Sequence, residues 1–113
     1  MHEVGLMAEA VRLAVEEARA RGAQRVAALR LRVGALSGVV PEALEFAFDL
    51  VTAGTPAAGA RLEVERVAAR WRCPRCRAEY ESMDVWSACP RCETAPGELL
   101  QGRELELVSI ELD

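Results

Sequence analysis

Four cysteines in two evenly spaced pairs are the residues of this chain best suited to chemistry. Cys73 and Cys76 form one Cys-x-x-Cys pair, Cys89 and Cys92 form the other, and twelve residues separate the pairs. A turn of this kind directs two sulfur atoms at one ion and leaves backbone N–H groups free to bond to them. Two such turns complete a tetrahedral site of four thiolates, which suits Zn²⁺, with iron as the competing ion. Because the protein fills all four positions, we expect a structural zinc site.

Other chemistries of paired cysteines fit this segment less well. Two disulfides are disfavoured in a reducing cytosol. A thioredoxin-like dithiol needs its Cys-x-x-Cys at the start of a helix within a βαβ unit, whereas both pairs here lie in a segment rich in Pro and Arg that is typical of a hairpin. A rubredoxin-like iron site is chemically compatible with the same four sulfurs. Zinc is the prediction, and iron stays open.

Three aromatic residues, Trp71, Tyr80 and Trp86, flank the cysteines. A module this small needs a few large side chains besides its metal, so we expect the aromatics to form a miniature core. A base-stacking surface is the alternative, with phosphate contacts from five arginines: Arg70, Arg72, Arg75, Arg77 and Arg91. Acidic residues balance these charges along the same segment, which favours the core.

The single histidine, His2, lies at the other end of the chain. The terminal amine of Met1, the amides of His2 and Glu3, and the imidazole all fall within one short stretch. Ni²⁺ and Cu²⁺ can recruit deprotonated amides, and a nitrogen-rich square-planar site is typical of these two ions. The spacing allows an N-terminal nickel or copper site without requiring one.

Two segments have the periodicity of amphipathic helices. Residues 3–21 carry apolar side chains every three or four positions, with Leu13 at the margin of the stripe, and Gly22 follows as the expected C-cap. Pro41 suits the first turn of a second helix, which Gly54 ends. The apolar stripe of this second helix comprises Leu44, Ala47, Phe48 and Val51.

Three segments have the alternation of β-strands: 25–33, 61–67 and 102–113. The last one changes phase between Leu107 and Val108, which indicates a bulge or cover on both faces. The fold class predicted is α+β, with a three-stranded sheet, two helices on one face and an inserted zinc-ribbon module. We expect residues 1–70 and 99–113 to form the α+β domain and residues 71–98 to form the zinc ribbon.

The composition excludes several classes of function. The chain has 113 residues, 51% of them hydrophobic, so it can bury a core. Its formal charge of −4 disfavours binding to nucleic acid. No apolar run approaches the roughly 20 residues that span a bilayer, and the N-terminus lacks the features of a signal peptide. We therefore expect a cytoplasmic protein without membrane or nucleic-acid partners.

Four stretches together resemble the HypA (HybF) family of nickel metallochaperones in hydrogenase maturation. They are MHEVGLMAEAV, VGALSGVVPEALEFAFDLVTAGT, CPRC…CPRC and GRELELVSIEL; the resemblance runs the length of the chain and keeps the order of the elements. The resemblance implies a nickel site at Met1-His2-Glu3 and a zinc site at the four cysteines. His2 would supply its imidazole, with the amides of His2 and Glu3 as further donors. Either the terminal amine or a residue of the 38–42 loop would complete the square.

The resemblance also implies partners. They are a HypB-type maturation GTPase and the large-subunit precursor of NiFe-hydrogenase as recipient of the ion. A zinc-ribbon adaptor for nucleic acid or transcription is the alternative function, which the acidic charge disfavours. An enzyme is not expected, because a closed four-thiolate site cannot activate water and the chain has no internal histidine.

Overall fold

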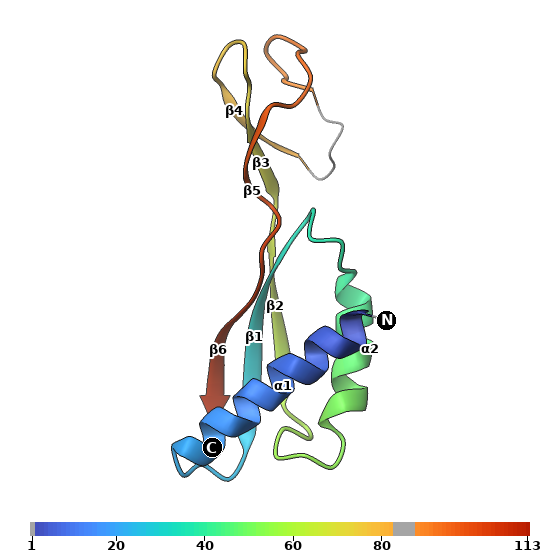
Figure 1. Cartoon of the computed structure of the whole chain (residues 1–113), viewed down its shortest axis with the longest axis vertical. Helices are drawn as coiled ribbons and strands as arrows, with labels where there is room; N and C mark the ends of the chain where they lie inside the picture. Colours follow the sequence, from blue (N-terminus) through green and yellow to red (C-terminus); the bar gives the residue numbers. More distant parts are fainter. Residues whose placement is uncertain (1, 83–87) are drawn as a thin grey trace. The chain divides into compact units, whose positions relative to one another are not determined.

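The computed structural model describes residues 2–82 and 88–113, with side chains from Glu3 onward. Two compact units make up the chain. The first comprises Met1–Leu31, Val39–Glu65 and Glu106–Asp113, and the second comprises Arg32–Gly38 and Arg66–Leu105. The elements occur in the order α1, β1, α2, β2, β3, β4, β5 and β6 (Figure 1). The observed fold is α+β, as predicted.

Helix α1 spans His2–Ala20 and matches the predicted helix within one residue at each end. Its buried side is the predicted apolar stripe: Met7, Val11, Ala14, Val15 and Ala18. Leu13 was expected at the margin of this stripe but is 44% exposed, so that part of the prediction was wrong. Gly22 has a φ of 72°, and the amide of Ala23 donates to the carbonyl of Ala18 at 2.8 Å. These are the features of a Schellman cap.

Helix α2 spans Pro41–Thr52, with Pro41 in its first turn as expected. Its buried residues are Leu44, Ala47, Phe48 and Thr52, whereas Val51 is only half-buried. Thr52 is tolerated inside because its hydroxyl donates to the carbonyl of Phe48 at 2.8 Å. The two helices pack against each other in the first unit.

The first sheet has the strand order β2-β1-β6. Its strands span Val26–Gly34 (β1), Arg61–Val67 (β2) and Leu105–Leu112 (β6). On β1, Leu29, Leu31 and Val33 are buried and Arg30 is exposed, as the alternation predicts. The predicted strand over 102–113 is shorter than expected at its start. Its half-buried residues Leu107, Ile110 and Leu112 retain the change of phase, and the bulge stays a prediction.

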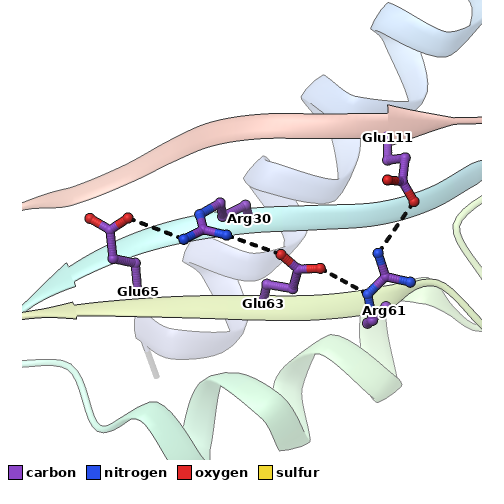
Figure 2. Close-up of polar contacts among 5 residues, drawn as sticks. All are labelled: Arg30, Arg61, Glu63, Glu65 and Glu111. Carbon is purple, nitrogen blue, oxygen red and sulfur yellow. Dashed lines mark hydrogen bonds and ion pairs between the residues drawn. The ribbon is translucent and has the colours of Figure 1, made fainter.

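A network of ion pairs lies on the exposed face of this sheet, with α1 behind it (Figure 2). Arg30 contacts Glu63 and Glu65 at 3.2 and 3.3 Å, and Arg61 contacts Glu63 and Glu111 at 2.8 and 3.3 Å. Each side chain is at least one-third exposed. Exposed pairs of this kind contribute little stability each, and their effect here is to neutralise the open face.

The second sheet, absent from the sequence prediction, has the order β4-β3-β5. Its strands span Ala69–Arg72 (β3), Glu79–Ser82 (β4) and Glu98–Gln101 (β5), and β3 pairs antiparallel with both neighbours. Next to this sheet, the backbone at Gly34 packs directly against the backbone at Gly102. A Cβ added at Gly34 would lie 2.1 Å from the Gly102 carbonyl oxygen. The amide of Leu36 donates to the same oxygen at 2.7 Å.

Candidate metal centre

The two Cys-x-x-Cys pairs form two turns with the same backbone pattern. In the first, the amide of Cys73 donates to the carbonyl of Ala78 at 2.8 Å, and the amide of Arg77 donates to the carbonyl of Cys73 at 3.1 Å. In the second, Cys89, Thr94 and Glu93 take the same places, with distances of 2.9 and 2.8 Å. The repeat of Cys-Pro-Arg-Cys in the sequence is therefore a repeat in structure.

The turns also donate to their own sulfur atoms. Amides of Arg75 and Cys76 lie 3.4 Å from Cys73 Sγ, and the amide of Arg91 lies 3.4 Å from Cys89 Sγ. These N–H groups stabilise negative charge on the sulfurs to which they point. The geometry expected of two metal-binding knuckles is present at both pairs.

The four sulfur atoms come together in one cluster, with each within 4.8 Å of every other. Cys73 Sγ lies 3.3 Å from Cys92 Sγ, and Cys76 Sγ lies 3.6 Å from Cys89 Sγ. A tetrahedral zinc site with Zn–S bonds of about 2.3 Å separates its sulfurs by about 3.8 Å, whereas a disulfide needs about 2.05 Å. All four cysteines are free thiols. The cluster therefore fits a four-thiolate metal site and not a pair of disulfides.

The surroundings of the cluster lower the pKa of some of its thiols and raise the pKa of another. The hydroxyl and amide of Thr94 lower the pKa of Cys92 to about 6. The backbone amides of Cys76 and Arg75 lower the pKa of Cys73. At Cys76 the amide of Ala78 favours the thiolate, but desolvation and the neighbouring sulfurs outweigh it and raise the pKa to about 11. A divalent cation removes this conflict because it favours the thiolate form of every ligand.

The aromatic residues around the cluster form the expected small core. Trp71 is 7% exposed and Tyr80 is 8% exposed, and both pack with Cys73 and Cys89. The indole N–H of Trp71 donates to the Ser82 hydroxyl at 2.9 Å. The core prediction is confirmed for Trp71 and Tyr80. The same prediction for Trp86 lies outside the described residues.

Two of the five arginines proposed for a phosphate-binding surface are engaged with carboxylates. Arg70 contacts Glu79 and Glu81 at 3.0 and 3.5 Å, and Arg72 contacts Glu79 and Glu98 at 3.3 and 3.1 Å. The three other arginines, Arg75, Arg77 and Arg91, are exposed. With the rings of Trp71 and Tyr80 buried and two of its cations neutralised, the described part of the second unit presents no aromatic surface on which bases could stack.

The N-terminal candidates are placed only in part. Met1 lies outside the described residues, as does the His2 side chain. The backbone of His2 begins α1, so the amide of Glu3 lies in the first helical turn. The sequence predicted a helix that starts at residue 3, one residue later than observed. The Cys-to-Thr94 contact was also missed, although a hydroxyl residue two positions after the second pair is visible in the sequence.

The α+β fold and the four-cysteine cluster define a small metal-binding protein, and the comparisons with known proteins give its class. A family model described as "Hydrogenase/urease nickel incorporation, metallochaperone, hypA" matches residues 1–112. The chain belongs to the HypA family. Its members are metallochaperones and not enzymes, in agreement with the sequence prediction.

Individual relatives match over nearly the whole chain. A hydrogenase maturation factor HypA from Picosynechococcus sp. is 41% identical over 112 residues, covering 99% of both chains. One from Chloroflexus aurantiacus is 43% identical and covers 98% of both chains. The solution structure of a HypA protein matches with a TM-score of 0.71 at 20% identity, covering 99% of this chain and 96% of that one. That of the Ni metallochaperone HypA from Helicobacter pylori has a TM-score of 0.63 at 18% identity, covering 97% and 96%. At these identities the structural matches establish the fold alone.

Proposed function

We propose that this chain binds Ni²⁺ at its N-terminus and delivers it to the large-subunit precursor of NiFe-hydrogenase, together with a HypB-type GTPase. Membership of a nickel incorporation family supports the cargo. One structural observation supports the location: α1 begins at His2. The first four N–H groups of an α-helix have no acceptor within the helix. The amides of His2 and Glu3 can therefore release their protons to solvent and bind a metal without breaking a helical hydrogen bond.

The proposed ligands are four nitrogen atoms within three residues. They are the Met1 amine, the His2 amide, the His2 imidazole and the Glu3 amide. A residue of the 38–42 loop is the alternative to the amine. Nitrogen donors that include ionised amides favour a square-planar ion, which selects Ni²⁺ or Cu²⁺ over Zn²⁺. Since the amides must lose their protons and the imidazole must be neutral, the nickel affinity should fall steeply as the pH is lowered.

We assign a structural Zn²⁺ to Cys73, Cys76, Cys89 and Cys92. The support is the donor set: four sulfurs within 4.8 Å of one another, with backbone N–H groups directed at two of them. When bound, the ion supplies a cross-link that a module with so small a core needs in order to fold. Because the protein fills every position, this ion should not exchange during nickel delivery. Iron at the same sulfurs would be revealed by elemental analysis and visible colour.

We place the protein in the cytoplasm, where thiols stay reduced and available for metal. Among the described residues, no helix is both long and apolar enough to cross a membrane. The HypB-type GTPase and the hydrogenase precursor are the proposed partners, with neither nucleic acid nor membrane among them.

A nickel titration of the zinc-loaded protein tests the N-terminal site. We expect a yellow absorption band that saturates at one nickel per chain and is lost in His2→Ala while the zinc content is unchanged. Repeating the titration at lower pH should weaken the binding. Equal nickel binding by wild type and His2→Ala would place the cargo elsewhere and contradict the proposal.

Two substitutions at position 3 separate the amide from the side chain. Glu3→Pro removes the amide N–H but fits the first turn of a helix, so the fold should persist while the square-planar band disappears. Glu3→Gln keeps the amide and removes only the carboxylate charge, and it should retain the band. If both variants lose it, the Glu3 carboxylate is required for the site, which contradicts a ligand role confined to the backbone amide.

Zinc chelation tests the second site. Removing zinc should abolish the fixed environments of Trp71 and Tyr80, seen in near-ultraviolet circular dichroism, while the nickel band remains. Loss of the nickel band upon chelation would mean that the two sites are not independent. Delivery is then tested by mixing the nickel-loaded chain with the GTPase and the hydrogenase precursor, where transfer should fail with His2→Ala.

A further inference from the structure

The outward face of α2 carries large apolar side chains that are exposed to solvent. Phe46 is 62% exposed and Leu50 is 57% exposed. They lie four residues apart, so they are neighbours on the same side of the helix. The buried residues Leu44, Ala47 and Phe48 lie on the opposite side. Neither exposed side chain contributes to the core, and a pair of this size on one helical face is a candidate contact surface.

The same helix carries only negative charge. Between Pro41 and Thr52 there are three carboxylates, Glu42, Glu45 and Asp49, and no basic residue. Glu45 and Asp49 are exposed, and neither forms an ion pair with any residue that the structure describes. By helical spacing, Asp49 and Glu45 border Phe46, while Leu50 follows Phe46 one turn on. The surface is an apolar pair with an acidic border.

Most carboxylates elsewhere in the described chain form ion pairs with arginines of the same chain. On α1, Glu9 and Glu16 pair with Arg12, and Glu17 pairs with Arg21. Both sheets carry the networks of Arg and Glu described above. The face of α2 thus combines unneutralised carboxylates with the two most exposed large apolar side chains among the described residues, Phe46 and Leu50.

We propose that Phe46, Leu50, Glu45 and Asp49 form a docking site for a segment of a partner protein that presents large apolar side chains together with Lys or Arg. The inference rests on the proposed function, because a carrier must contact the protein with which it exchanges its ion. The apolar pair supplies the buried centre of the contact, and the carboxylates select a basic partner and orient it.

Charge decides against the other occupants of this surface. A second copy of the same face would bring Glu45 and Asp49 against their own kind, in a chain whose net charge is already −4. Anionic membranes and nucleic acids would be repelled for the same reason. A basic and apolar protein segment is the one occupant that both features of the face favour.

Photo-crosslinking from position 46 tests the proposal directly. Benzoylphenylalanine replaces Phe46 in the full-length chain, an aromatic for an aromatic at an exposed site, and the nickel-loaded protein is irradiated in an extract of its own organism. Leu13, an exposed apolar residue of α1, provides the control position. Mass spectrometry then identifies the peptide attached at each position.

The expected result is one heterologous peptide that contains both large apolar and basic residues, attached at position 46 and not at position 13. Changing Glu45→Gln and Asp49→Asn should reduce its yield at least tenfold, and so should 0.5 M salt. A crosslink to a second copy of this chain, a peptide without basic residues, or no yield above the control position would each overturn the proposal.

Affinity for the identified segment, made as a synthetic peptide, completes the test. Leu50→Ser and Asp49→Asn should each weaken the binding about tenfold or more, whereas Leu13→Ser and Glu16→Gln should leave it unchanged. All four variants should bind one nickel per chain as wild type does. If the wild-type protein binds nickel normally but does not bind the peptide, the docking proposal alone is contradicted. If it binds the peptide but does not bind nickel at its N-terminus, the proposed function is contradicted instead.

Discussion

Arg77 and Glu93 occupy the same position in the two metal-binding turns, and both have a positive φ, 67° and 58°. Each directly follows the second cysteine of its pair. Its amide donates to the carbonyl of the first cysteine, so the chain must turn there in the left-handed region. Side chains with a Cβ are disfavoured in this conformation, whereas glycine adopts it freely.

Glycine at either position should therefore stabilise the zinc-loaded protein. The strained conformation costs about 1–2 kcal/mol, and the entropy lost by glycine returns part of the gain, so we expect about 0.5–1 kcal/mol for Arg77→Gly or Glu93→Gly. Denaturant unfolding with zinc present measures this change. Arg75→Gly is the matched control, since Arg75 has no positive φ, and it should destabilise. A loss of stability in all three variants would contradict the argument.

The hydrogen bond between Trp71 and Ser82 should matter because the indole is buried. Ser82→Ala leaves the Trp71 N–H without its acceptor at 2.9 Å, and we expect a loss of about 1–2 kcal/mol. Equilibrium unfolding of the zinc-loaded protein measures the loss. In a Trp71→Phe background no N–H remains, so the same Ser82→Ala change should cost much less. An equal cost in both backgrounds would assign the effect to other contacts of Ser82.

A side chain at Gly34 should be poorly tolerated. The added Cβ would lie 2.1 Å from the Gly102 oxygen and 2.7 Å from the Arg103 nitrogen, both backbone atoms that cannot rotate away. Gly34→Ala should reduce the free energy of unfolding by more than about 2 kcal/mol. Gly5→Ala is the contrast, because its Cβ meets nothing within 4 Å and α1 gains about 1 kcal/mol of helix propensity. Thermal melts should therefore shift in opposite directions.

The network in Figure 2 predicts a shifted titration at Glu63. Hydrogen bonding from Arg61, together with Arg30, lowers the pKa of Glu63 below its ordinary value. A carboxyl whose folded pKa is lowered contributes stability that is present above its unfolded pKa, about 4.3, and is lost as the pH falls through the folded value. NMR titration of the carboxyl carbon should show this low pKa. It should rise toward the ordinary value in Arg61→Gln and in high salt. An unchanged pKa in Arg61→Gln would contradict the assignment.

Periodicity predicted most of the first unit because each of its elements buries one continuous face. The stripe on α1 and the alternation on β1 both follow from burial on one side, so spacing alone locates them. The second sheet was not predicted. Strands β3, β4 and β5 have only four residues each, too short for alternation to be visible, and they are joined by pairing along β3.

Part of the candidate site was likewise predictable from the sequence, and part was not. Cysteine spacing predicted the cluster because two turns with fixed geometry leave few arrangements for four sulfurs. The left-handed conformations at Arg77 and Glu93 were not predictable, since neither residue type favours them. The stripe predicted for α2 was largely correct, since Leu44, Ala47 and Phe48 are buried, but it did not draw attention to the large apolar residues outside it, Phe46 and Leu50, which are exposed.

Strands β3 and β5 lie side by side, with Arg70 opposite Gln101. The chain thus passes Arg70 on β3 and returns at Gln101 on β5, two positions that lie within about 5 Å of each other, as paired antiparallel residues do. A stretch whose two ends lie this close together has the form of an insertion. In evolutionary terms, residues 71–98 could be lengthened, shortened or exchanged for another hairpin by changes in one continuous piece of the gene, with no other strand rerouted.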